Sequence, residues 1–314
     1  VPMNLNGKGG LSSIPTGSIA RIEVLKGAAS ALYGSDAMSG VVNVITKIPT
    51  KEGGSATIGV GNMGSQTYKI NYGTPHFLIG VERGFFGKQD PSTPVRTDSV
   101  SHPRGYEYYT ARDKGNSLGV FMSGKLSDKV TLNFSRFEGK SAYAQLSTES
   151  NATNRNRHST TYAYDDSKNN ASLIFKDGNT TGTLFYNDRD LKGTNRKHSL
   201  PSYTSNDSNY IARQYGFDVQ HEWDFRGGKD YLIGGVLGKR ETYRTTSGPV
   251  YASPHRHSLA LYGSYSYQIN PTWTTIVGLR YTDIKDPVKN QHVLTPQFQL
   301  NHRINKESSV YMNV

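Results

Sequence analysis

Apolar and polar residues alternate with a period of two along most of the chain beyond residue 50. In Gln214–Phe225 the odd positions are mainly aromatic or aliphatic, and the even positions are mainly polar. Ser258–Ile269 and Thr272–Thr282 repeat the pattern. Because successive side chains of a strand point to opposite faces, this alternation predicts half-exposed β-strands.

We predict thirteen such strands after a linker rich in turn residues at Ile48–Gly54. Their ranges are 55–61, 65–73, 77–86, 117–125, 129–138, 170–177, 180–188, 211–225, 230–243, 256–269, 272–283, 292–303 and 307–314. Runs near ten residues match the length that a tilted strand needs to cross a bilayer. Trp223, Phe225, Trp273 and Tyr281 lie near strand ends, where aromatic residues suit a membrane interface.

The connections between these strands alternate in length. The short ones are 73–76, 127–128, 177–179, 226–229, 270–271 and 305–306, and the long ones are 87–116, 139–169, 189–210, 244–255 and 284–291. This alternation is typical of an outer-membrane barrel with short periplasmic turns and long extracellular loops. A soluble β-sandwich would not place its long loops so regularly at one end.

Composition excludes several other classes. No run of 18 apolar residues occurs among the 314, so we expect no transmembrane helix, and the absence of Cys excludes disulfides and thiolate metal sites. The net charge of +11 is spread over loops and strands rather than gathered on one helix, which argues against nucleic acid as a partner. No G-x-S-x-G, H-E-x-x-H or phosphate-loop string is present. We therefore predict no enzyme activity, no cofactor and no metal site.

Residues Ser18–Lys47 form a different segment, in which β-prone runs at 19–25 and 41–46 flank a linker rich in Gly, Ala and Ser. The strings RIEVLKG, SALYGSDA and SGVVNVIT stand in order at Arg21–Gly27, Ser30–Ala37 and Ser39–Thr46. They resemble the plug domain of TonB-dependent outer-membrane receptors, with Ser39 where that family usually has Gly. The alternative is a generic Gly-rich β-turn-β unit. The resemblance rests on Arg21, Glu23, Gly27, Leu32, Tyr33, Gly34, Ser35, Gly40 and Asn43.

The resemblance implies an all-β fold. Residues 1–50 would be the C-terminal part of the plug domain, and residues 51–314 the N-terminal portion of a transmembrane antiparallel β-barrel, about thirteen of 22 strands. The chain begins Val1-Pro2-Met3-Asn4 with no signal peptide and ends inside an expected strand, so we interpret it as an internal fragment of a longer receptor.

By the same resemblance, the function is active transport of a scarce nutrient, most often a ferric siderophore, across the outer membrane. The expected partners are TonB with ExbB and ExbD, the ligand and outer-membrane lipid, and the full-length receptor is expected to be a monomer. A haem or cobalamin receptor and a non-transport surface-binding barrel stay open as alternatives. A passive porin-like channel is disfavoured by the plug motif.

The expected long loops carry basic and aromatic residues that are candidates for ligand binding. Guanidinium and aromatic faces together suit planar, anionic ligands such as iron-loaded catecholates, although the same residues would also suit lipopolysaccharide phosphates or water. The candidates are Arg104, Tyr106, Tyr108, Arg155, Arg157, His158, Arg196 and Lys197. Further loop histidines, His102, His198 and His255, keep a haem- or metal-binding role open.

Overall fold

The computed structural model describes residues 14–26, 32, 40–48, 50–87, 95–99, 102–112, 114–149, 157–199, 202–245, 255–305 and 308–313. Apart from the short 3₁₀ helix η2 (Thr16–Ser18), regular structure in this part of the chain is β-strand. None of these segments forms a helix long and apolar enough to span a membrane. The strands are β1 (Ile19–Lys26), β2 (Gly40–Thr46), β3 (Gly53–Val60), β4 (Gln66–Gly73), β5 (Phe77–Phe86), β6 (Val95–Ser99), β7 (His102–Arg112), β8 (Gly115–Lys125), β9 (Val130–Glu149), β10 (Arg157–Asp177), β11 (Thr180–Ser199), β12 (Ser202–Phe225), β13 (Asp230–Thr245), β14 (His255–Asn270), β15 (Trp273–Lys285), β16 (Gln291–Arg303) and β17 (Ser309–Asn313).

The first sheet is the antiparallel hairpin of β1 and β2. Glu23 and Asn43 are direct cross-strand partners, and the Asn43 amide donates to the Glu23 carboxylate at 3.4 Å. The Arg21 guanidinium holds the other oxygen of Glu23 at 2.7 Å. Three residues of the sequence motif therefore stabilise the pairing of the two strands, and the strands predicted at 19–25 and 41–46 are confirmed.

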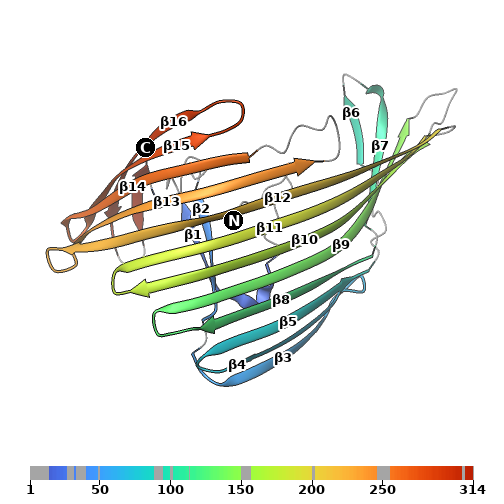
Figure 1. The fold of residues 1–314 in the computed structure, drawn as a ribbon. Coiled ribbons are helices and arrows are strands. Elements are labelled where there is room, and N and C mark those ends of the chain that lie inside the picture. Colours follow the sequence, from blue (N-terminus) through green and yellow to red (C-terminus); the bar gives the residue numbers. More distant parts are fainter. Residues whose placement is uncertain are drawn as a thin grey trace.

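The second sheet contains all thirteen predicted strands, in the order β17-β16-β15-β14-β13-β12-β11-β10-β9-β8-β5-β4-β3. Every neighbour pair is antiparallel, and the chain passes from each strand to the adjacent one except between β5 and β8, where β6 and β7 intervene. Figure 1 shows that the sheet is strongly curved and lies open, with the hairpin of β1 and β2 at its hollow. The short turns lie together at one edge, which we call the short-turn end; the opposite edge is the long-connection end.

The long connections are mostly not loops, which corrects the sequence-based boundaries. β9 and β10 stay paired up to Thr148 and Arg157, and β11 and β12 stay paired up to Ser199 and Ser202. Most of 139–169 and 189–210 is therefore strand. Apolar alternation ends where the strands leave their apolar surroundings, whereas backbone pairing continues because each strand still supplies the N–H and C=O groups that its neighbour needs.

The connection expected at 87–116 also contains strand. β6 and β7 form a hairpin, and β7 pairs with the far half of β9, from Tyr106 opposite Glu149 to Arg112 opposite Tyr143. β8 pairs with the near half of the same strand, from Asn116 opposite Lys140. β7 and β8 therefore follow one another along a single edge of β9.

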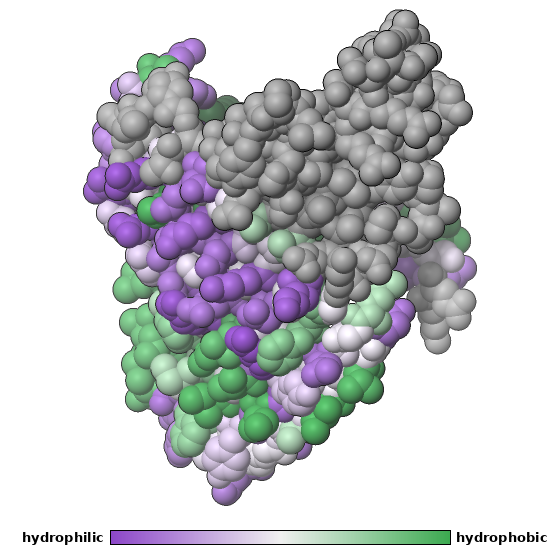
Figure 2. Space-filling model, turned by 90° about the vertical axis from the view of Figure 1, so that its right-hand side faces the viewer, coloured by the Kyte–Doolittle hydropathy of each residue, from purple (hydrophilic) through white to green (hydrophobic). Residues whose placement is uncertain are grey.

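The two faces of the large sheet have the opposite character from those of a soluble sheet. On β14, Leu259 and Leu261 are 53% and 66% exposed, whereas Ser264 and Ser266 on the other face are 6% and 4% exposed. Apolar side chains on the exposed side and polar ones on the enclosed side indicate a wall with lipid outside and water inside. We call these the outer and the inner face. Hydrophobic residues gather low on the surface in Figure 2, with hydrophilic residues above them.

The apolar zone of the outer face has the height of a bilayer core. On β12 it runs from Phe225 and Trp223 at the short-turn end to Tyr215, all exposed. Ten residues cover about 33 Å along a strand, or roughly 25 Å at a tilt of about 40°. Tyr186 stands opposite Tyr215 and marks the same limit on β11. We call this zone the apolar band.

Candidate functional site

The plug segment is attached to the inner face at β5. The Glu82 carboxylate accepts hydrogen bonds from the Thr16 hydroxyl at 2.8 Å and from the Gly17 N–H at 3.2 Å. Lys69 on β4 lies 3.8 Å from the same Glu82 oxygen and donates to the Thr16 hydroxyl. One carboxylate thus holds the η2 turn, and a neighbouring lysine balances its charge.

An aromatic contact lies beside this polar one. A Cβ on Gly80 of β5 would come within 2.2 Å of the Phe121 ring, so the ring of β8 lies directly on the Gly80 backbone. A Cβ on Gly17 would meet the same ring at 2.9 Å, and one on Gly119 would meet Pro15 at 3.0 Å. Phe121 is only 4% exposed. The close fit of glycine against aromatic and proline rings lets the plug approach the wall at van der Waals distance.

A second attachment lies on β15, far from β5 in the sheet order. Arg280 Nη1 donates to the Leu32 carbonyl of the plug at 3.1 Å, and its Nε donates to Thr282 at 3.2 Å. The guanidinium also lies 5.3 Å from the centre of the Tyr262 ring, whose hydroxyl donates to Asp218 at 2.7 Å. A segment bonded to both β5 and β15 of one curved sheet has to lie within its concavity. The plug is therefore seated inside the wall.

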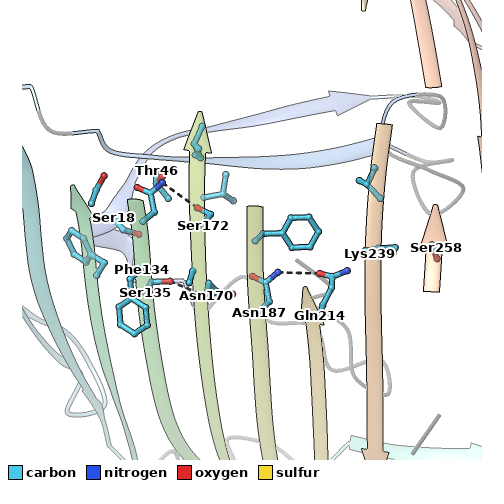
Figure 3. A pocket seen from close by; sticks show the side chains of 18 of the residues that line it. Ser18, Thr46, Phe134, Ser135, Asn170, Ser172, Asn187, Gln214, Lys239 and Ser258 are labelled. Atoms are coloured by element: carbon cyan, nitrogen blue, oxygen red, sulfur yellow. Dashed lines mark hydrogen bonds between the residues drawn. The ribbon is translucent and has the colours of Figure 1, made fainter. Parts of the chain in front are cut away.

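A cavity of about 570 Å³ remains between the plug and the inner face. Ser18, Val44, Thr46 and Lys47 line it from the plug side. Figure 3 shows Ser18 and Thr46 above side chains that come from a series of neighbouring strands. The wall side includes Ser135, Asn170, Ser172, Asn187, Gln214, Lys239 and Ser258.

The wall of this cavity carries one continuous cross-strand row of mainly polar residues. The backbone register places Ser55, Asn71, Gly80, Phe121, Ser135, Asn170, Asn187, Gln214, Glu241 and Arg256 side by side on ten successive strands. Neighbours in the row are hydrogen bonded, with Asn170 donating to Ser135 at 3.1 Å and Asn187 to Gln214 at 3.3 Å (Figure 3). The Gln214 amide donates in turn to Glu241 at 3.1 Å. We call this set the polar row.

A charged cluster lies on the inner face above the polar row, toward the long-connection end. Arg189 binds Asp166 through two parallel hydrogen bonds of 2.8 Å each, and Lys168 Nζ lies 3.9 Å from the same carboxylate. Both cations are at least nine-tenths buried. Lys168 lies beyond the level of Tyr186 and thus outside the apolar band. Burial lowers the pKa of its amine to about 8, and the negative charge of Asp166 opposes that change. Both cations therefore share the Asp166 carboxylate.

The ligand candidates named from the sequence lie on strands rather than in loops. Arg104, Tyr106 and Tyr108 are on β7, Arg157 and His158 begin β10, Arg196 and Lys197 are near the end of β11, and Arg155 lies outside the described residues. The register brings some of them together, because Tyr108 and His158 both pair with Ser147 of β9. Lys197 pairs with Thr160, two positions from His158. Seven of the eight candidates, all except Arg155, therefore belong to one paired extension of the wall.

Sequence reasoning missed the polar row and the charged cluster, because both lie on strands at positions that read as the polar half of an alternating pattern. The signal was present in the sequence. With apolar positions facing lipid, the intervening positions have to face the interior, but only the register shows which of them are neighbours.

Of the plug motif, Gly27, Tyr33, Gly34 and Ser35 lie outside the described residues, and Gly40 begins β2 opposite Lys26. Among the described side chains, no three His, Cys, Asp or Glu residues gather as a metal site.

Comparison with known families agrees with this geometry. The TonB-dependent receptor plug domain family matches residues 1–41, and the TonB dependent receptor-like β-barrel family matches residues 64–314. The second match covers most of the chain, so the protein belongs to the TonB-dependent receptors. That family consists of outer-membrane transport receptors rather than enzymes.

Individual relatives are similar over different lengths. The vitamin B12 transporter BtuB of Vibrio vulnificus is 51% identical over 57 residues, which are 17% of this chain and 9% of that protein. The ferripyoverdine receptor of Pseudomonas aeruginosa has a TM-score of 0.61 at 14% identity, over 94% of this chain and 46% of that one. The ferric enterobactin receptor PfeA from P. aeruginosa has a TM-score of 0.60 at 15% identity, over 95% and 48%. The likeness to these solved structures concerns the fold, and the chain spans about half their length.

Proposed function

We propose that this chain is part of an outer-membrane receptor that imports a ferric siderophore with energy delivered by TonB together with ExbB and ExbD. In this proposal residues 1–50 are the C-terminal part of the plug, residues 51–314 form the N-terminal portion of the barrel, and the complete receptor works as a monomer. The observation that carries the proposal is the seating of the plug between Glu82 on β5 and Arg280 on β15.

This seating has a mechanical consequence. A plug bonded at two distant strands closes the passage, and both attachments have to break or shift before a solute can pass. The polar row then supplies a surface of amides, hydroxyls and charges that can hydrogen bond to water along the passage. Pulling on the plug is a way to break these few contacts, and each neutral hydrogen bond contributes only about 1 kcal/mol.

The charge of the inner face favours an anionic nutrient. Lys168 and Arg189 both lie against Asp166 in an enclosed place, where electrostatic attraction is strong. The strand residues Arg157, Arg196 and Lys197, with Tyr106 and Tyr108, are proposed as the first contacts for the ligand, together with Arg104, Arg155 and His158. Ferric siderophores with catecholate groups are anionic and flat, and they suit guanidinium and tyrosine side chains.

A cobalamin receptor is the second candidate, because 57 residues of the chain are 51% identical to a vitamin B12 transporter. Haem uptake and surface binding without transport remain weaker alternatives. A titration of the complete receptor with labelled ferric siderophores, cobalamin and haem separates these candidates. Tight binding of cobalamin alone would replace the siderophore proposal.

The transport step is tested by locking the plug. The chain contains no Cys, so a pair introduced as Thr16→Cys with Glu82→Cys in the complete receptor can form a disulfide between plug and wall. Oxidation should abolish uptake of labelled nutrient while leaving binding at the surface, and reduction should restore uptake. The matched control is Glu23→Cys with Asn43→Cys, which are cross-strand partners within the plug hairpin. If the Thr16–Glu82 disulfide forms and uptake continues, the plug does not gate the passage.

A further inference from the structure

A tyrosine side chain crosses one whole strand of the wall beside the second plug attachment. Tyr262 of β14 stands opposite Gly235 of β13 in the register, and its hydroxyl reaches past Gly235 to donate to Asp218 of β12 at 2.7 Å. A Cβ on Gly235 would meet both the ring and the hydroxyl of Tyr262 at 2.5 Å, and the Val219 carbonyl at 2.8 Å. Only glycine therefore leaves room for this crossing.

On its other side, the Tyr262 ring contacts the arginine that binds the plug. Arg280 of β15 is the direct cross-strand partner of Tyr262, and its guanidinium lies 5.3 Å from the ring centre. Tyr262 therefore stands between Arg280 and Asp218, and the two charges act on each other across it. We call Asp218, Tyr262 and Arg280 the latch group.

The charge of Arg280 is enclosed without an ion pair while the plug is seated. Arg280 is 5% exposed, and among the residues that the structure describes no carboxylate lies within 4 Å of it. Its hydrogen bonds go to neutral acceptors, the Leu32 carbonyl of the plug at 3.1 Å and the Thr282 hydroxyl at 3.2 Å. A hydrogen bond between two charged groups is roughly twice as strong as a neutral one. A carboxylate would therefore hold this guanidinium more strongly than the plug carbonyl does.

A second set of partners lies within reach of these side chains. The Tyr262 hydroxyl, which donates to Asp218, also lies 3.5 Å from the side-chain oxygen of Gln220 on the same strand. A shift of the hydroxyl to Gln220 leaves the Asp218 carboxylate available to Arg280. Each polar group keeps a partner in this second arrangement, as enclosed polar groups require. Two complete arrangements of the same side chains make a two-state element.

We propose that the latch group switches between these arrangements when the plug is pulled. Arg280 exchanges the Leu32 carbonyl for the Asp218 carboxylate. The Tyr262 hydroxyl moves to Gln220 at the same time. Asp218 thus stabilises the released state, whereas the Tyr262 hydroxyl stabilises the seated state by binding Asp218. This inference rests on the proposed function, since it assigns how the plug is released, but it does not depend on which nutrient is carried.

The test pulls on the plug of the complete receptor, reconstituted in lipid, from the short-turn side by single-molecule force spectroscopy. The rate of plug release at constant force is measured for the unaltered receptor, Asp218→Asn, Tyr262→Phe and the double variant. Binding and uptake of labelled nutrient are measured separately in the same forms. A plug that switches as proposed in a receptor that imports nothing would contradict the transport proposal alone, so the two failures are distinguishable.

Two matched variants remove the same chemistry away from the plug attachments. Tyr265→Phe, also on β14, breaks the hydrogen bond from Tyr265 to Asp230 at 3.4 Å. Asp224→Asn, also on β12, removes a carboxylate that accepts from Asn179 at 2.9 Å. Both variants should leave the rate of plug release unchanged, and a change in either as large as in the latch variants would overturn the proposal.

Asp218→Asn should slow release about tenfold, because the released state loses the charged partner of Arg280. Tyr262→Phe should speed release about tenfold, because the Asp218 carboxylate then has no donor while the plug is seated. The double variant should behave like Asp218→Asn, since no carboxylate is left for the hydroxyl to bind. A purely structural role of the latch group predicts faster release in both single variants. Unchanged or faster release in Asp218→Asn, unchanged or slower release in Tyr262→Phe, or a double variant as fast as Tyr262→Phe would each overturn the proposal.

Discussion

Glu82 of the wall accepts the hydroxyl hydrogen of Thr16 in the plug at 2.8 Å, although 66 positions separate the two residues in the chain. The contact is reinforced by the Gly17 N–H and by Lys69. It joins the segment that precedes β1 to the fifth strand, so the plug and the wall are one bonded structure at this point.

Glu82→Gln should loosen the plug without disturbing the sheet. The amide can still accept one hydrogen bond, but it loses the charge that strengthens the bonds from Thr16 and Gly17 and that attracts Lys69, for a cost of about 1–2 kcal/mol. Hydrogen exchange at the Gly17 amide should rise about tenfold in the complete receptor. Glu138→Gln, which removes a carboxylate from the outer face, is the control and should leave that amide unchanged. Unaltered exchange in Glu82→Gln would mean that this carboxylate does not hold the η2 turn.

Gly80→Ala should destabilise the wall where the plug rests on it. The added methyl would stand 2.2 Å from the Phe121 ring and force the ring toward Gly17, and overpacking of this kind costs about 1–3 kcal/mol. The temperature at which the folded receptor loses its fast migration on a gel should fall. Gly124→Ala on β8 is the control, because nothing lies within 4 Å of its would-be Cβ. Equal melting of the two variants would show that the ring moves aside freely.

Asp230→Asn should destabilise the turn before β13. Arg226 has a left-handed φ of +51° in this turn, and its guanidinium binds the Asp230 carboxylate, donates to the Gln268 carbonyl at 2.7 Å and lies 4.5 Å from the Tyr267 ring centre. The amide of Asn keeps one acceptor oxygen but loses the charge that holds Arg226, so we expect a cost of about 1–3 kcal/mol.

The measurement is the melting temperature of the complete receptor at pH 7, which should fall in Asp230→Asn. Asp177→Asn, at an exposed partner of Lys129, serves as the control and should leave the melting temperature unchanged. Equal melting temperatures of the unaltered receptor and Asp230→Asn would contradict the expectation.

Surface labelling should distinguish the two ends of the strands. A Cys placed at Ser199, where β11 ends, should react with a membrane-impermeant maleimide on intact cells that carry the complete receptor. A Cys placed at Ser127, in the turn between β8 and β9, should react only after the outer membrane is permeabilised. The reverse preference would invert the topology.

The arrangement of strands was predictable from the sequence because lipid and water impose alternation on every strand that crosses the apolar band. Thirteen of the fifteen strands described in 51–314 were found on that signal, β6 and β7 being missed, and the hairpin of β1 and β2 was found on the motif around Glu23 and Asn43. Beyond the band both faces are wet, so residues such as Tyr164, Lys192 and Ser208 give no period. The ends of β9 and β11 were therefore placed too early, and the starts of β10 and β12 too late.

The candidate site was less predictable, for a different reason. Glu82, Arg280 and Lys168 appear in the sequence as single charges within strands, and nothing local separates them from charges that face water. The roles of Glu82 and Arg280 depend on partners 66 and 248 positions away, which only the register and the curvature of the sheet bring together. Residues such as Tyr106 and Arg196 were noticeable because they cluster in sequence, yet the plug contacts lie elsewhere.

The paired extensions of β9 to β12 constrain how the mouth of such a receptor can change over evolution. One inserted residue would exchange the inner and outer positions of everything beyond it on that strand, so Lys168 and Arg189 would turn away from the interior. Insertions that preserve the faces come as two residues in each of two partner strands. The long-connection end can thus lengthen or shorten in steps of about 6.6 Å for each added or removed pair of residues. Each step adds or removes one ring of side chains that can contact a ligand.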